Sequence, residues 1–257
     1  MIYAVFFIFT FFILFFAFYQ WQHLMIFTPV HVKDRSLCEA CEYLSIHTDD
    51  GVELEGIVYE PVNAVATLLI FVGRSHDAVA LMRKLSECYP DLRLITFNYR
   101  GYGKSGGKVS EKHLLSDGVK IAQLVQKHYG DFYLLGFSLG SNVAAFIASK
   151  QKVKALFLVG AFDSIVSLSK TKYPKLCCAS QIVRYKLPTE SYVKNVDAPT
   201  YLFASRDDET VFIENTRKLR DAVKHLQLYQ EFEGISHRDI LWEPEVCNTI
   251  NKVIKNG

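Results

Sequence analysis

The sequence has almost no excess of either charge, with 29 Lys and Arg against 27 Asp and Glu, for a formal net charge of +2. A protein that binds nucleic acid through its phosphates needs a marked excess of basic residues. The charge balance therefore gives no indication of a nucleic-acid or strongly anionic partner. The 257 residues suffice for one sizeable domain with a buried core, and are too few for two ordinary domains and an anchor.

No lysine or arginine precedes Lys33, and residues 1–19 carry no charge and eight phenylalanines. A helix needs about 20 apolar residues to cross a bilayer, and this run reaches that length with the residues that follow it. A cleaved signal peptide would have a basic start and a small-residue cleavage site, and neither is found here. We therefore expect residues 1–21 to form an uncleaved, single-pass transmembrane anchor, with Tyr19 and Trp21 at the interface.

The six cysteines lack the spacing of a metal site. Cys38 and Cys41 form a single C-x-x-C, and Cys177 with Cys178 does not supply the second pair that a zinc site needs. A redox C-x-x-C normally lies in a βαβ context, which this segment does not have. We expect free or incidentally paired thiols, and we predict no metal and no cofactor.

Short apolar segments alternate with helix-like segments along the rest of the chain. Strands are predicted at 42–47, 53–59, 66–72, 94–98, 132–135, 155–159, 200–204 and 228–232, and helices at 78–87, 111–128, 141–149, 214–225 and 245–255. This alternation predicts an α/β fold, with a mostly parallel sheet and helices on both faces. Residues 22–41 are predicted to be a connector and 42–257 one domain, with a short, less regular cap region at 161–198. Because that domain holds every candidate site residue, we expect deletion of 1–33 to leave it folded.

A G-x-S-x-G motif, Gly136-Phe137-Ser138-Leu139-Gly140, follows a buried strand and precedes a helix rich in small residues. A serine held at a sharp strand-to-helix turn needs neighbours without bulk, so that the backbone can close and the hydroxyl can project. The start of the helix adds a positive dipole and free N–H groups. The motif in this context indicates that Ser138 is a nucleophile.

A second glycine motif, Gly101-x-Gly103-x-x-Gly106, also follows a predicted strand. A dinucleotide site would need an acidic residue about 20 positions further on, at the end of the next strand. Asp117 lies nearby but falls inside a predicted helix, and the next strand ends at Ser138 instead. A phosphate-binding P-loop also fails, because the glycine that must stand five positions before Gly103 is missing. We therefore predict no nucleotide partner.

The Ser138 motif and the turn 97–105, Phe-Asn-Tyr-Arg-Gly-Tyr-Gly-Lys-Ser, resemble the α/β-hydrolase superfamily from about residue 42 onward. The likeness extends to its membrane-anchored α/β-hydrolase-domain proteins and to its monoacylglycerol-lipase and serine-aminopeptidase-like group. It implies the α/β-hydrolase fold, here preceded by one transmembrane helix. It also implies a catalytic triad in the chain order serine, acid, histidine.

That order places the catalytic base after Ser138, where only His225 and His237 occur. His225 ends a predicted helix, whereas His237 lies in a loop just after the last strand, where the family keeps its base. The acid is expected after the strand 200–204. The family pattern there resembles Gly-x-x-Asp-x-x-Val, which favours Asp208 and leaves Asp207 as the alternative.

The family also implies an oxyanion hole made of two backbone N–H groups. One is expected from Leu139, and the other from Arg74 in the loop after the strand 66–72. This chain has Val72 where the family usually has histidine, so the shape of that loop is less certain from sequence than the triad. The Arg74 side chain has two interpretations, a surface charge or a substrate contact.

These residues predict a serine hydrolase that cleaves carboxylic esters, with acyl lipids at a membrane as the expected substrates. A thioesterase or serine peptidase would use the same triad, and a non-catalytic binding protein could share the fold. The positive-inside rule, applied to Lys33 and Arg35, predicts that the hydrolase domain lies in the cytosol.

Overall fold

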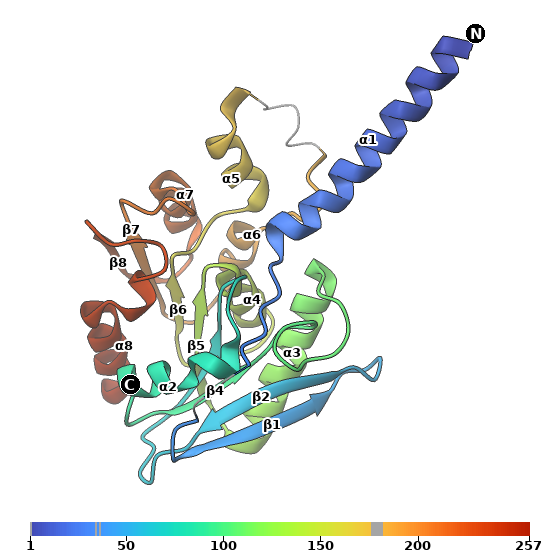
Figure 1. The fold of residues 1–257 in the computed structure, drawn as a ribbon. Helices are drawn as coiled ribbons and strands as arrows, with labels where there is room; N and C mark the ends of the chain where they lie inside the picture. The colour runs from blue at the N-terminus through green and yellow to red at the C-terminus, as the bar shows by residue number, and fades with distance from the viewer. Residues whose placement is uncertain (1, 34, 36, 176–181) are drawn as a thin grey trace.

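Eight strands form one sheet in the order β1-β2-β4-β3-β5-β6-β7-β8 (Figure 1). The computed structural model describes residues 2–33, 35, 37–175 and 182–257. The strands are β1 (Cys41–His47), β2 (Glu53–Tyr59), β3 (Thr67–Phe71), β4 (Arg93–Phe97), β5 (Phe132–Phe137), β6 (Leu156–Val159), β7 (Thr200–Ser205) and β8 (Leu226–Phe232). Each of the eight overlaps a strand predicted from the sequence.

The first two strands form an antiparallel hairpin, and β2 is also antiparallel to β4. The hairpin turns at Asp50-Gly51, where Gly51 has a φ of 80° that favours glycine. From β4 through β8 every pairing is parallel. The carboxyl ends of these parallel strands meet at one edge of the sheet, which is where an open α/β sheet places its ligand site.

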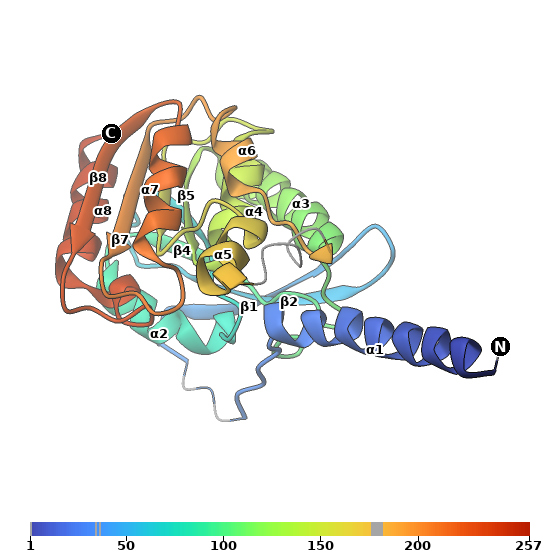
Figure 2. The ribbon, with the colours of Figure 1, turned by 90° about the horizontal axis from the view of Figure 1, so that it is seen from above.

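Alternate residues of β3 point into two separate cores. Leu69 and Phe71 pack with residues of α3 (Glu111–Tyr129) and α4 (Leu139–Ala148), while Leu68 and Ile70 pack with α2 (Ala78–Cys88) and α8 (Pro244–Asn256). Successive side chains of a strand point to opposite faces of the sheet. Helices therefore cover both faces, as Figure 2 shows, and the predicted α/β-hydrolase architecture is confirmed.

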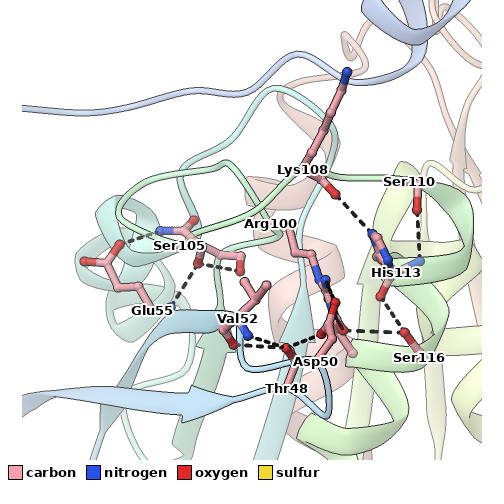
Figure 3. Close-up of polar contacts among 12 residues, drawn as sticks. Thr48, Asp50, Val52, Glu55, Arg100, Ser105, Lys108, Ser110, His113 and Ser116 are labelled. Carbon is pink, nitrogen blue, oxygen red and sulfur yellow. Dashed lines mark hydrogen bonds and ion pairs between the residues drawn. The ribbon is translucent and has the colours of Figure 1, made fainter.

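The turn between β4 and α3 is held by a buried arginine (Figure 3). The Arg100 guanidinium forms forked hydrogen bonds with Asp50 at 2.6 and 2.8 Å and with Asp117 at 2.7 and 2.8 Å. Hydrogen bonds to Asp117 and Asp50 raise the pKa of Arg100, which fixes its positive charge. Gly103 has a φ of 54°, and a Cβ there would lie 2.0 Å from the Asn98 side chain. Packing in the turn thus accounts for Gly103 without any bound nucleotide.

The N-terminal helix α1 (Ile2–Ile26) projects away from the domain (Figure 1). It is long and apolar enough to cross a membrane. Its large side chains are exposed from Tyr3, at 89%, to Trp21, at 53%, but Gln22 is only 8% exposed. The helix thus continues five residues beyond the predicted anchor, and its last turns dock onto the domain.

The segment after α1 is fixed to the domain at several points. Phe27 is 1% exposed, and the Val30 carbonyl accepts a hydrogen bond of 2.9 Å from the N–H of Gly103. Arg35 forms ion pairs with Glu55 at 2.5 Å and Asp77 at 2.6 Å. The segment after residue 21 is therefore attached to the folded domain at these points. Its deletion would open a cavity at Phe27, so the expectation that 1–33 can be removed without harm is not supported.

Within its described residues, 161–175 and 182–198, the cap region contains two short α-helices, α5 (Ile165–Lys172) and α6 (Thr189–Val193). A further helix, α7 (Ile213–Ala222), packs against both of them. The part of the cap at 176–181, including Cys177 and Cys178, lies outside the described residues. The sulfurs of Cys38 and Cys41 are bonded to each other.

Candidate active site

Ser138 sits between the end of β5 and the start of α4, with φ 52° and ψ −117°. A non-glycine residue with positive φ is strained, and such strain gathers at active sites. The flanking glycines make the turn possible. A Cβ at Gly136 would lie 2.6 Å from the backbone of Gly140 and Ser141, and one at Gly140 would lie 2.0 Å from the Phe71 carbonyl oxygen. Both glycines of the motif are therefore required by backbone packing.

Two hydrogen bonds join the three residues predicted as the triad. Nε2 of His237 lies 2.9 Å from Oγ of Ser138, and Nδ1 of His237 lies 2.5 Å from Oδ2 of Asp208. All three residues are buried, with 5 to 7% of their surface exposed. The bond to Asp208 orients the imidazole ring so that its Nε2 atom faces Oγ of Ser138.

The structure separates the roles of the two neighbouring aspartates. Oδ1 of Asp208 accepts hydrogen bonds from the N–H groups of Thr210 at 2.8 Å and Val211 at 2.7 Å, which aims Oδ2 at His237. Oδ2 of Asp207 instead accepts a bond of 2.6 Å from the N–H of Gly234 at the surface. Asp208, the preferred residue in the sequence analysis, is the one beside the histidine.

Aromatic and small residues shape the pocket around the His237 ring. The ring stacks on Phe137 with 5.2 Å between centroids, and a Cβ at Gly160 would come within 3.2 Å of its Cε1 atom. His76 packs against the same Phe137 at 5.6 Å. Burial, together with the nearby His237, lowers the pKa of His76. The environment of His76 therefore favours its neutral form.

The two predicted oxyanion donors, Leu139 and Arg74, line the same cavity as Ser138. Leu139 is the first residue of α4. The N–H groups in the first turn of a helix have no acceptor within that helix, so they are free to donate elsewhere. Arg74 lies in the loop after β3, and its carbonyl accepts a hydrogen bond of 2.7 Å from the hydroxyl of Tyr102. Its guanidinium is exposed and donates to the carbonyl of Met25 in α1. The Arg74 side chain thus holds the end of α1, a role that neither sequence interpretation included.

A cavity of about 120 Å³ opens at Ser138 and has a mainly apolar lining. The cap and the loop after β7 supply part of that lining through Phe162, Ile165, Leu168 and Val211. Met25 and Ile26 of α1 also line it. Sequence reasoning missed these two residues because nothing in the local pattern shows that the end of the helix folds over the active site. Among the described residues, no three His, Cys, Asp or Glu side chains gather as a metal site requires.

A family model described as the alpha/beta hydrolase fold matches residues 71–176, which include the Arg74 loop and the Ser138 turn. The esterase Pf2001 of Pyrococcus furiosus has a similar structure, with a TM-score of 0.72 over 90% of this chain and 97% of that one, at 18% identity. The chain has the α/β-hydrolase fold, and the family match supports its assignment to that superfamily. At this identity the structural likeness establishes the fold alone.

The curated proteins that this chain resembles have low sequence identity to it. It is 26% identical over 202 residues to the uncharacterized protein Rv2307c of Mycobacterium tuberculosis, covering 76% of this chain and 71% of the relative. It is 25% identical over 195 residues to the lysophosphatidylserine lipase ABHD12 of Macaca fascicularis, covering 63% of this chain and 48% of the lipase. The chain thus aligns with about half the length of the lipase. Together with the family match, these relatives support a hydrolase of the esterase or lipase type.

Proposed function

We propose that this α/β-hydrolase is a serine hydrolase that cleaves the carboxylic esters of acyl lipids at a membrane surface. The observation that carries the proposal is the hydrogen-bonded series from Ser138 through His237 to Asp208. The apolar cavity beside Ser138 suits an acyl chain, and α1 is long enough to hold the protein in a bilayer. The distant lysophosphatidylserine lipase relative supports the same substrate class.

In the acylation step, Nε2 of His237 accepts the Ser138 proton as Oγ attacks the ester carbonyl carbon. Asp208 holds the imidazole in the tautomer that leaves Nε2 free, and it stabilises the imidazolium that forms. The N–H groups of Leu139 and Arg74 would donate to the oxyanion, and loss of such a donor typically costs about 3 kcal/mol. His237 then gives its proton to the leaving alcohol, which leaves an acyl-Ser138 ester.

Deacylation repeats the chemistry with water as the nucleophile. His237 removes a proton from a water molecule, and the resulting hydroxide adds to the acyl carbon. Collapse of the second tetrahedral intermediate breaks the bond to Ser138, which recovers its proton from His237. The products are a fatty acid and an alcohol, and the enzyme returns to its starting state.

The proposal is tested by labelling the full-length protein with a fluorophosphonate, which reacts with an activated serine. We expect Ser138→Ala to abolish labelling and ester turnover without unfolding the protein, because the change removes one oxygen. The matched control is Ser86→Ala, since the Ser86 hydroxyl only bonds the Arg83 carbonyl on α2. Persistent labelling of folded Ser138→Ala would place the nucleophile elsewhere, and an unlabelled wild type would favour a binding protein. Turnover rates of oxygen ester, thioester and amide substrates that share one acyl chain then show which class of bond the enzyme cleaves best.

We also propose that α1 is an uncleaved single-pass anchor and that the hydrolase domain faces the cytosol. The basic residues Lys33 and Arg35 follow the helix, and the positive-inside rule places them on the cytosolic side. Protease added outside sealed microsomes should then digest the domain. Full protection would place the domain in the lumen, an oxidising compartment in which a bond between Cys38 and Cys41 would persist.

A further inference from the structure

The last turn of α1 is a wall of the cavity that contains Ser138. Met25 and Ile26 line this cavity together with Ser138 and Leu139. They are half-buried, and Ile26 also packs against the main core of the domain. A helix that served only to tether the domain would need no contact with the catalytic cavity.

Specific contacts hold the end of α1 in this position. The Gln22 side-chain amide donates to the carbonyl of Ile182 at 3.2 Å and accepts from the N–H of Arg184 at 2.8 Å. Nδ1 of His23 lies 2.8 Å from the hydroxyl of Tyr185, and Phe27 packs edge-on against the same ring at 4.8 Å between centroids. These contacts attach the helix to the cap region, so the helix and the cap enclose the cavity together.

The exposed part of α1 fixes where the bilayer lies relative to the cavity. About 20 residues cross the hydrocarbon core, and Tyr3 to Trp21 is the stretch that the domain leaves exposed. Tyr19 and Trp21 suit the membrane interface, and the Arg184 guanidinium lies 4.6 Å from the centre of the Tyr19 ring. Trp21 and Met25 are four residues apart, which is about 6 Å along a helix. The cavity wall thus begins within about one helical turn of the membrane surface.

We propose that Met25 and Ile26 form an acyl-binding wall, and that the acyl chain of a membrane lipid reaches Ser138 by moving along the last turn of α1 from the bilayer. This inference rests on the proposed ester hydrolase activity and adds the route and the residues that select the acyl chain. The wall is apolar, so contact with a longer chain buries more apolar surface. The end of the helix therefore determines acyl-chain length selectivity.

The test uses the full-length protein in phosphatidylcholine vesicles and p-nitrophenyl esters with acyl chains of graded length, from butyrate to palmitate. We expect Met25→Ala and Ile26→Ala to lower kcat/KM for palmitate by about tenfold, the equivalent of about 1.4 kcal/mol, and to lower it much less for butyrate. Met25→Trp should block long chains more strongly. Leu24→Trp is the matched control, since Leu24 is the neighbouring residue, is 68% exposed and does not line the cavity.

The outcomes separate this inference from the proposed function. Three results would each overturn the acyl-wall inference. They are an equal loss of kcat/KM at every acyl-chain length, a chain-length preference that does not change, and an effect of Leu24→Trp as large as that of Met25→Trp. In those cases wild-type fluorophosphonate labelling would still support the serine hydrolase. Failure of wild-type labelling would instead overturn the proposed function. Met25→Leu keeps the packing volume and should keep the palmitate preference, which guards against misreading a folding defect.

Discussion

Asp207 and Asp208 are adjacent in the chain, yet only Asp208 faces His237. We predict that Asp208→Asn lowers kcat by about 10⁴, as in a comparable triad, because an amide favours the wrong imidazole tautomer. Asp207→Asn should have a mild effect, since it changes one exposed hydrogen bond to Gly234. Steady-state turnover of p-nitrophenyl butyrate by both variants is the measurement. The reverse ranking of the two variants would assign the acid role to Asp207.

The positions of the site residues were largely predictable, for reasons that differ from residue to residue. Ser138 follows from local sequence because its turn depends on the small neighbours Gly136 and Gly140. His237 is 99 residues from Ser138 and 29 residues from Asp208, the two residues to which it is hydrogen-bonded. Only the family order of the triad suggested that these three residues would meet. Their catalytic roles stay predictions. The bond from Arg74 to Met25 could not be foreseen, because it joins a loop side chain to a helix carbonyl 49 residues away, and neither segment carries a pattern that indicates it.

At the scale of elements, a single hydroxyl links the segment after α1 to the loop after β3. The Tyr102 hydroxyl accepts a hydrogen bond of 3.0 Å from the N–H of Thr28 and donates one of 2.7 Å to the carbonyl of Arg74. Tyr102 is fully buried, so no water can easily replace either bond. The loop after β3 carries the Arg74 N–H group that is proposed to bind the oxyanion. The position of this loop thus depends on the segment that follows α1.

We predict that Tyr102→Phe lowers kcat by about tenfold, or about 1.4 kcal/mol, with little change in KM. The reason is that the Arg74 carbonyl loses its donor and the loop can rotate away from the oxyanion. The control is Tyr89→Phe, because the buried Tyr89 hydroxyl has no hydrogen-bond partner among the described residues. Steady-state kinetics together with the rate of fluorophosphonate labelling would check it. A rise in KM at constant kcat would contradict a role in positioning the oxyanion loop.

The regular elements were predictable because their hydrophobic periods are strong, as in the fully buried strands β3 and β5. The cap helices α5 and α6 were predicted only as irregular chain. They have eight and five residues, which is too short for a clear helical period. The helix α1 was expected to end near Gln22, a polar residue. In the structure that side chain is satisfied by the backbone near Ile182, a partner 160 residues away that local reasoning does not see.

At the scale of the whole molecule, Arg35 joins the segment after α1 to the sheet and to α2. Its side chain is 5% exposed, and those of Asp77 and Glu55 are 0% and 10% exposed. Burial alone would lower the pKa of Arg35, but its hydrogen bonds to Glu55 and Asp77 raise it instead. Asn98 also donates to both carboxylates, so removal of the arginine leaves two buried acids bound only to neutral groups.

We predict that Arg35→Met lowers the free energy of unfolding by about 3 to 5 kcal/mol, the typical cost of breaking a buried ion pair from one side. Arg83→Met is the control, because Arg83 is 62% exposed and its pair with Glu87 at 3.8 Å should contribute less than about 1 kcal/mol. Urea unfolding in detergent, followed by circular dichroism, compares the two variants. Equal stability of the two would mean that the buried pairs do not hold the segment after α1.

The contact between Gln22 and Ile182 also has a consequence for the order of events during synthesis. The helix leaves the ribosome first, whereas its partner in the cap follows 160 residues later. At about 5 to 20 residues per second this interval lasts about 8 to 32 s. During that time α1 can enter the bilayer while the surface that will receive its last turns does not yet exist. With α1 as the proposed anchor, the domain would complete its folding against a helix already in the membrane, and the cavity would be closed last.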